Sequence, residues 1–132
     1  MEWCQIFLEQ GIGPSSTGII IVRADVEGCF AMSHTQPFRR FPAYYDRQHE
    51  NGPGPEPISQ GKVIDPTGTG NAFMGGFAIG LIETGDVIEA ISYGTVSSSF
   101  ALEQIGVPRR TVAEDGSELW NGDSVRTYTD YH

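Results

Sequence analysis

The sequence predicts an α/β fold, and three features of the chain support that prediction. A β-branched run at residues 18–22 has the composition of a buried strand. The short apolar pair Val63-Ile64 leads into a glycine-rich turn. Two stretches of helical length, 71–83 and 86–104, follow that turn. We therefore expect the carboxy-terminal part of a sheet, with these two helices packed on it.

The amino-terminal elements are predicted from local patterns. Residues 2–10 place apolar side chains at helical spacing, which indicates a helix. The apolar segments 18–22 and 29–32 flank a tight turn at 25–28, so we expect a β-hairpin there. Residues 36–61 are rich in proline and glycine and are expected to form a long surface connection.

The carboxy-terminal elements begin with Val63-Ile64, which should form a short strand before the helix at 71–83. Three glycines inside that helix are small enough to allow close approach to a neighbouring element. They are Gly75, Gly76 and Gly80. Asp86 is expected to cap the second helix. We assign residues 1–108 to one domain and 109–132 to a polar tail that docks through Leu119-Trp120.

Composition narrows the classes of partner and location. The formal net charge of −9 argues against non-specific binding of nucleic acid, which depends on clustered lysine and arginine. The longest apolar run, 72–82, is too short to span a bilayer, and no signal segment is recognisable. Cys4 and Cys29 have no zinc-site spacing and are expected to be reduced thiols. These features favour a cytoplasmic protein without nucleic-acid or membrane partners, and they leave its oligomeric state open.

The turn between the predicted strand and the first long helix is suited to binding an anion. Its glycines permit positive φ angles and close approach of a ligand to the backbone. The first amides of a helix point outward without intrahelical partners, and the helix dipole places positive charge behind them. The residues whose amides are expected to form this anion hole are Gly68, Thr69, Gly70 and Asn71.

The same stretch resembles the second signature of the ribokinase-like (PfkB) family of sugar and nucleoside kinases, Asp-Thr-Thr/Asn-Gly-Ala-Gly-Asp-x-Phe. Five residues match it in register: Asp65, Thr67, Gly68, Gly70 and Phe73. Residues 93–99 are similar to a Phe-Gly-Asn-Ala-Ala-Ala segment beside the family's adenine pocket. Residues 21–28 resemble a strand and turn that contact nucleotide phosphates. The resemblance covers residues 1–110 and corresponds to the carboxy-terminal portion of the family fold.

The resemblance implies ATP-dependent phosphoryl transfer, with Mg²⁺, to a hydroxyl of a small sugar or nucleoside. It implies nucleotide contacts at four positions: Arg23, Gly28, Thr95 and Ser98. Asp65 and Thr67 match positions that help to bind a monovalent cation in some members of the family. The alternative is that Asp65 only caps the turn, and the sequence favours neither.

One position departs from the family pattern in a way that affects catalysis. Asn71 stands where the family has the aspartate that takes the proton from the acceptor hydroxyl. A neutral carboxamide orients a hydroxyl but has no basic site near neutral pH. Loss of a general base costs about 10²–10⁴-fold in rate, although a loose phosphoryl transition state depends less on such a base.

Two further departures concern the nucleotide and the length of the chain. Asp25 lies in the turn near the expected nucleotide phosphates and would repel them. The family's amino-terminal half, with its sugar-binding motif and lid, has no counterpart in this sequence. We therefore expect a carboxy-terminal fragment, a mis-predicted gene start or a truncated paralogue.

Three functional hypotheses follow. The first is a kinase-family domain that retains nucleotide or phosphate binding and is impaired in catalysis. The second is a competent sugar or nucleoside kinase that tolerates Asn71 because water or another residue acts as the base. The third is a non-enzymatic protein that binds a partner through an open sheet edge.

Overall fold

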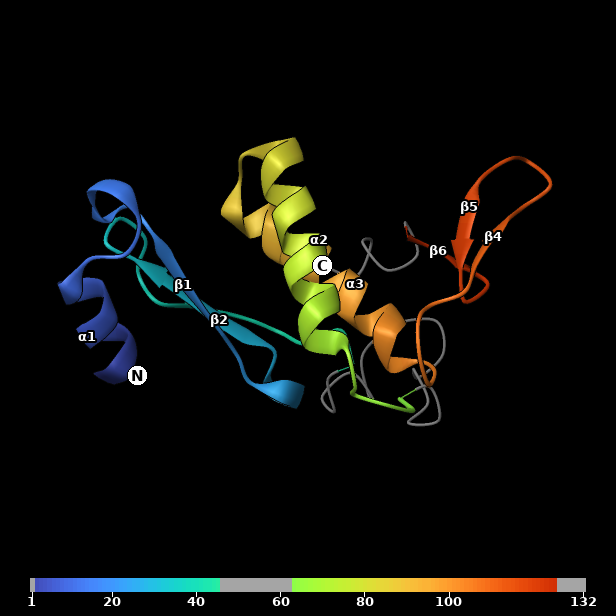
Figure 1. Cartoon of the computed structure of the whole chain (residues 1–132), viewed down its shortest axis with the longest axis horizontal. Coiled ribbons are helices and arrows are strands. Elements are labelled where there is room, and N and C mark those ends of the chain that lie inside the picture. The colour runs from blue at the N-terminus through green and yellow to red at the C-terminus, as the bar shows by residue number, and fades with distance from the viewer. Residues whose placement is uncertain (1, 46–62, 126–132) are drawn as a thin grey trace, which may run out of the picture. The chain divides into compact units, whose positions relative to one another are not determined.

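The computed structural model describes residues 2–45 and 63–125, and these belong to two units, Met1–Asp46 and Arg47–His132. Figure 1 shows the helices and strands of both units. Each unit is described below by itself.

The amino-terminal unit contains one helix and a three-stranded antiparallel sheet in the order β1-β2-β3. Its elements are α1 (Glu2–Gln10), the 3₁₀ turn η1 (Pro14–Ser16), β1 (Ile19–Arg23), the 3₁₀ turn η2 (Asp25–Glu27), β2 (Cys29–Ser33) and β3 (Arg39–Phe41). The predicted helix and hairpin are both confirmed. The ring of His34 bonds through Nε2 to the Leu8 carbonyl at 2.7 Å, which ties the end of α1 to the sheet.

β3 lies inside the segment expected to be an irregular connection. Residues 39–41 instead pair with residues 29–31 of β2. Gly28 makes this pairing possible, because it has φ +85° and a Cβ at this position would collide with the Phe41 carbonyl oxygen. The rest of the expected connection, 46–62, lies outside the described residues.

Cys29 lies in the core of this unit with Leu8 and Ala31. Burial raises the pKa of the Cys29 thiol to about 11, and the nearby Arg23 partly offsets this shift. A rise from 9.0 to about 11 lowers the thiolate fraction at pH 8 about 100-fold.

We expect iodoacetamide at pH 8 to modify Cys4, which is half-buried, well before Cys29 in the folded protein. Peptide mass spectrometry over time measures both rates. Unfolding in urea should bring the two cysteines to similar rates. Equal rates in the folded protein would show that the Cys29 thiol is not held in its protonated form.

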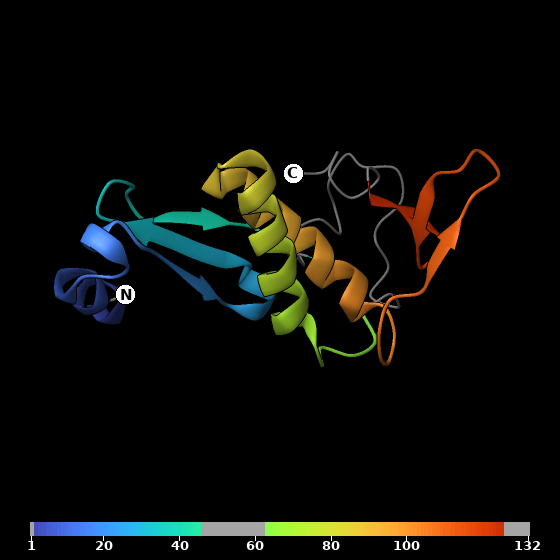
Figure 2. The same cartoon turned by 45° about the horizontal axis from the view of Figure 1, so that its top comes forward.

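The carboxy-terminal unit is built on two helices that pack against each other, α2 (Thr69–Thr84) and α3 (Val87–Leu102). They lie side by side in both Figure 1 and Figure 2. Gly85 ends α2 with φ +67°. The Asp86 carboxylate accepts hydrogen bonds from the amides of Ile88 and Glu89, at 2.7 and 3.1 Å. The predicted cap at Asp86 is therefore confirmed, while α2 begins two residues earlier and α3 ends two residues earlier than predicted.

The glycines of α2 explain how closely the helices approach. A Cβ on Gly76 would lie 2.6 Å from the Tyr93 carbonyl oxygen of α3, and one on Gly80 would lie 2.9 Å from the Cα of Ala90. These two glycines are required by packing, as expected. Gly75 differs, because nothing lies within 4 Å of a Cβ placed there.

The prediction of a strand at Val63-Ile64 is wrong. Neither residue is in a strand, and the amides of Ile64 and Asp65 both donate to the Leu102 carbonyl at the end of α3, at 2.8 and 3.1 Å. The segment has strand composition, but the acceptor that it meets is a helix terminus instead of a neighbouring strand.

The expected polar tail also contains more structure than its composition suggested. A second antiparallel sheet consists of β4 (Arg110–Val112), β5 (Glu118–Trp120) and β6 (Asp123–Ser124). Arg110 and Glu118 form an ion pair across its first two strands. The division of the chain into a domain ending at 108 and a tail stays a prediction.

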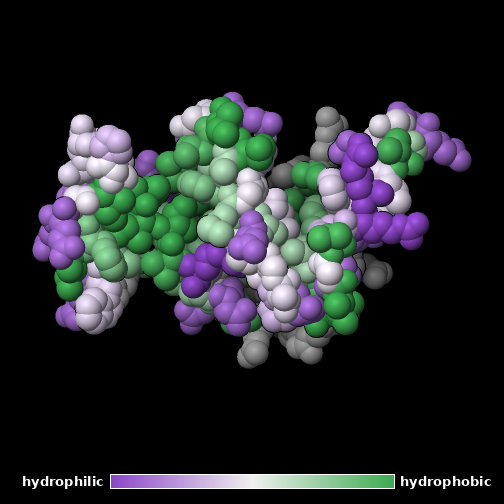
Figure 3. Space-filling model, viewed as in Figure 1, coloured by the Kyte–Doolittle hydropathy of each residue, from purple (hydrophilic) through white to green (hydrophobic). Residues whose placement is uncertain are grey.

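Helices and small sheets together agree with the predicted α/β class, while a partial ribokinase-like sheet stays a prediction. Several large apolar side chains of α2 are exposed, among them Met74, Ile79 and Ile82. They contribute to the hydrophobic surface over this helix in Figure 3. Among the described residues, no helix has the length and apolarity needed to cross a membrane.

Candidate functional site

The turn that precedes α2 is folded by its own side chains and by one glycine. The Pro66 carbonyl accepts bonds from the Thr69 amide at 3.3 Å and the Thr69 hydroxyl at 2.9 Å. Gly68 is the N-cap of α2, with φ +86° in the left-handed region, and open space surrounds the position of its absent Cβ. The backbone of this glycine is therefore accessible to a ligand.

The first turn of α2 contains amides that have no intrahelical acceptor. No side chain in the described part of the chain caps this helix end, and intrahelical bonding begins with the Ala72 amide, which donates to the Gly68 carbonyl at 2.9 Å. The Gly70 and Asn71 amides precede that bond and lie at the positive end of the helix dipole. Since the Thr69 amide is engaged by Pro66, we define the cradle as Gly68, Gly70 and Asn71.

Asp65 stabilises the entrance to this turn. Its Oδ1 atom accepts a hydrogen bond from the Thr67 amide at 2.9 Å. Hydrogen bonds from the backbone and side chain of Thr67 lower the pKa of the Asp65 carboxyl below its usual value, so the group is ionised at neutral pH. This geometry supports the turn-capping hypothesis. The role of Asp65 and Thr67 in binding a monovalent cation stays a prediction.

The predicted site residues divide into three groups in the structure. Asn71 is exposed on the first turn of α2, beside the cradle amides. Thr95 and Ser98 are buried on α3, where their hydroxyls donate to backbone carbonyls, those of Ile91 at 2.9 Å and Thr69 at 2.8 Å respectively. Arg23 and Gly28 belong to the amino-terminal unit, and their nucleotide contacts stay predictions.

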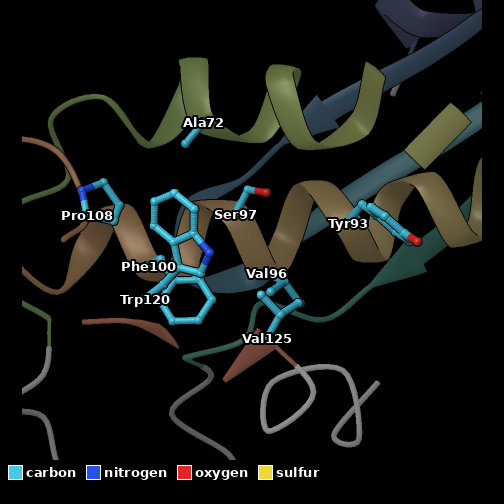
Figure 4. A pocket seen from close by; sticks show the side chains of 8 residues that line it. All are labelled: Ala72, Tyr93, Val96, Ser97, Phe100, Pro108, Trp120 and Val125. Carbon is cyan, nitrogen blue, oxygen red and sulfur yellow. The ribbon is translucent and has the colours of Figure 1, made fainter. Parts of the chain in front are cut away.

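An apolar pocket of about 550 Å³ opens beside the first turn of α2. Figure 4 shows the side chains that line this pocket, including Ala72 of α2 and Ser97 of α3, with Phe100 and Trp120 near the centre of the view. Its lining residues are Ala72, Tyr93, Val96, Ser97, Phe100, Pro108, Trp120 and Val125. Sequence reasoning identified Trp120 only as a docking point for the tail. A tryptophan within a polar stretch was the available signal for a larger role.

Asn121 holds the second sheet against the end of α3. Its Nδ2 group donates to the Phe100 carbonyl at 3.0 Å and to Glu103 Oε2 at 2.9 Å, while its Oδ1 accepts from the Arg109 amide at 2.9 Å. Asn121 adopts a positive φ of 54°, which asparagine tolerates better than most residues. These bonds place the neighbouring Trp120 in the wall of the pocket.

The cradle supplies backbone donors, and no cluster of metal-ligating side chains accompanies it among the described residues. Within residues 2–45 and 63–125, no three histidine, cysteine or acidic side chains are grouped in a way that could hold a metal ion. The arrangement as a whole combines backbone donors for an anion with an adjoining apolar pocket. Such a pair of surfaces suits a ligand with an anionic group and a flat apolar group.

Comparison with known proteins connects this arrangement to a family. Residues 10–111 match the model of the pfkB family of carbohydrate kinases. An uncharacterized protein of Schizosaccharomyces pombe is 34% identical over 94% of this chain and 35% of its own length. Protein MAK32 of Saccharomyces cerevisiae is 34% identical over 64% of this chain and 20% of its own length.

Inositol 3-kinase of Arabidopsis thaliana is 42% identical over 36% of this chain and 14% of its own length. The chain thus spans about a third of the length of the first relative, and less of the other two. No solved structure matches the chain. Because the family model covers most of the sequence, the chain belongs to the pfkB family of carbohydrate kinases.

Proposed function

We propose that this chain supplies the nucleotide-binding portion of a pfkB-type phosphotransferase, with phosphate binding retained and catalysis impaired. The observation that carries the proposal is the first turn of α2, where Gly68 is exposed and no cap from a described side chain is seen. Phosphoryl transfer depends mainly on positioning and on stabilising the charge of the transferred group. Backbone amides at a helix N-terminus do both without any charged side chain.

The cradle would bind the phosphates of ATP. The left-handed backbone of Gly68 leaves room for a phosphate to approach, while the Gly70 and Asn71 amides would donate to its oxygens. ATP would bring Mg²⁺, which would neutralise part of the charge of the phosphates. Asp65 stays ionised and is the nearby carboxylate suited to a monovalent cation.

The apolar pocket would hold the adenine base. Ala72 lies directly after Asn71 in α2, so the pocket begins where the cradle ends. Trp120 and Phe100 offer aromatic surface against which a flat heterocycle can pack. A phosphate at the α2 terminus and a base in the pocket would then belong to one nucleotide.

The acceptor is expected to be a small polyhydroxylated molecule, a sugar, a nucleoside or an inositol. The family description supports a carbohydrate, and the name of one relative adds inositol to the candidates. Asn71 would orient the acceptor hydroxyl without removing its proton, since a carboxamide has no basic site at neutral pH. We therefore expect slow turnover in the presence of bound nucleotide.

Fluorescence of Trp120 tests the binding part of this proposal. The chain has two tryptophans, and Trp3 lies in the other unit with 73% of its surface exposed. In a Trp3→Phe variant, titration with ATP and Mg²⁺ should change the emission of Trp120, with saturation below millimolar nucleotide. In the reciprocal Trp120→Phe variant, the emission comes from Trp3 and should not change when ATP and Mg²⁺ are added.

Calorimetry and thermal unfolding with ATP and Mg²⁺ give an independent measure on the unaltered chain. A bound ligand stabilises the folded state by mass action, so the unfolding temperature should rise with nucleotide concentration. The absence of heat, of a thermal shift and of a Trp120 response at millimolar ATP would reject nucleotide binding.

A further inference from the structure

Residues 64–69, which lead into and form the turn that carries the cradle, are hydrogen-bonded to one face of α3 at two points. The Leu102 carbonyl accepts from the Ile64 and Asp65 amides before the turn. Ser98 lies four residues before Leu102 on α3. Its hydroxyl donates at 2.8 Å to the carbonyl of Thr69, the first residue of α2. Residues four apart lie on the same face of a helix. The two ends of the cradle turn are therefore fixed against the same surface.

The bond from Ser98 acts on a specific peptide unit of the cradle. A peptide unit is planar and trans, so the carbonyl of Thr69 and the amide of Gly70 are rigidly linked and point in opposite directions. Fixing the carbonyl oxygen of Thr69 therefore fixes the direction of the Gly70 N–H. A hydrogen bond to the carbonyl also polarises the same amide and makes it a better donor.

Burial strengthens the hydrogen bond between Ser98 and Thr69. Ser98 and Thr69 are only 6% and 9% exposed, so water does not compete freely for the Thr69 carbonyl. The bond links residues 29 positions apart in the sequence, and it is the hydroxyl of α3 that reaches the first turn of α2. Ser98 also lies beside Ser97, which lines the pocket.

We propose that Ser98 is a positioning residue that aims the Gly70 amide at the bound phosphate, without touching the ligand itself. This inference rests on the proposed function and revises the role expected for Ser98, from a direct nucleotide contact to an indirect one. It predicts that loss of the hydroxyl weakens phosphate binding by more than its effect on stability explains.

Ser99 provides a matched control on the same helix. It is 1% exposed, and its hydroxyl donates at 2.7 Å to the Val96 carbonyl, within α3 itself. Ser98→Ala and Ser99→Ala thus each remove a buried, hydrogen-bonded hydroxyl group, and both should lower the unfolding temperature. Only Ser98→Ala removes a bond to the Thr69–Gly70 peptide unit, which carries one of the cradle amides.

The experiment titrates ATP with Mg²⁺ into the full chain and the variants by calorimetry, well below their unfolding temperatures. Ser98→Ala should weaken ATP affinity about three- to tenfold, the amount expected for one hydrogen bond, while Ser99→Ala binds as the unaltered chain does. Ser98→Thr keeps a hydroxyl donor and should restore most of the affinity. If Ser98→Ala does not fold, Ser98→Cys replaces the hydroxyl with a weaker donor and should weaken binding in the same direction.

The outcomes separate this inference from the proposed function. If the unaltered chain does not bind ATP, the proposed function is rejected and the role of Ser98 is rejected with it. If the unaltered chain binds ATP and Ser98→Ala binds as tightly as Ser99→Ala, the nucleotide site stands and the positioning role is overturned. If Ser98→Thr folds but does not restore ATP affinity, the proposed positioning role of the Ser98 hydroxyl is also contradicted.

Discussion

In a full-length version that includes the family's sugar-binding half, replacement of Asn71 by aspartate is expected to raise phosphoryl transfer at least about tenfold, since a positioned general base contributes about 10²–10⁴-fold. Asn71 is exposed on the first turn of α2, so a carboxylate there remains accessible to an acceptor hydroxyl. A negative charge at the helix N-terminus is also stabilised by the helix dipole, so the substitution should not impair folding. Product formation from labelled ATP measures the rate, with a panel of sugars, nucleosides and inositols as acceptors.

Asn71→Ala is the matched control, because it removes the carboxamide without adding a base. It should leave transfer at or below the level of the unaltered chain. A gain that is equal for aspartate and alanine would mean that Asn71 only obstructs the site. No gain for Asn71→Asp in a protein that still binds ATP would reject the missing base as the cause of slow turnover.

Neighbouring glycines in α2 should respond to alanine with opposite signs. At Gly76, a Cβ would lie 2.6 Å from the Tyr93 carbonyl oxygen, so the helices must move apart to accept it. Overpacking of this kind costs about 1–3 kcal/mol of unfolding free energy. At Gly75 the space is open, and replacing a helical glycine by alanine stabilises by about 0.5–1 kcal/mol.

Urea unfolding followed by circular dichroism compares Gly76→Ala and Gly75→Ala under identical conditions. We expect the midpoint of Gly76→Ala to fall and that of Gly75→Ala to rise, with similar m-values. The two substitutions differ by one position on the same helix and add the same methyl group. A common sign for both would contradict the close approach of α2 and α3 at Gly76.

Local patterns predicted most of the helical structure. Asp86 was identified as a helix cap because capping depends on residues within one turn of the helix end. The β1–β2 hairpin was predicted for the same reason, since both strands and their turn are contiguous in the sequence. Val63-Ile64 failed as a strand because strand formation needs a partner, and the amide of Ile64 meets the Leu102 carbonyl instead.

In the candidate site too, residues within one short segment could be predicted from the sequence, and residues brought in from distant segments could not. The glycine-rich turn and the position of Asn71 could be identified from the sequence, because both belong to one short segment with a recognisable spacing. The contribution of Trp120 could not, because it depends on the contact between the second sheet and α3. Asn121 makes that contact with Phe100, which lies 21 residues away in the sequence.

The amino-acid sequence was enough to identify the family, the two long helices and the cap at Asp86. Only the three-dimensional structure showed that Gly76 and Gly80 are required for packing and that the Ser98 hydroxyl bonds to the Thr69 carbonyl. This difference arises from the distance along the sequence over which each kind of interaction acts. Capping, periodicity and turn chemistry act within a few residues, whereas packing contacts and buried hydrogen bonds join residues whose separation no local pattern encodes.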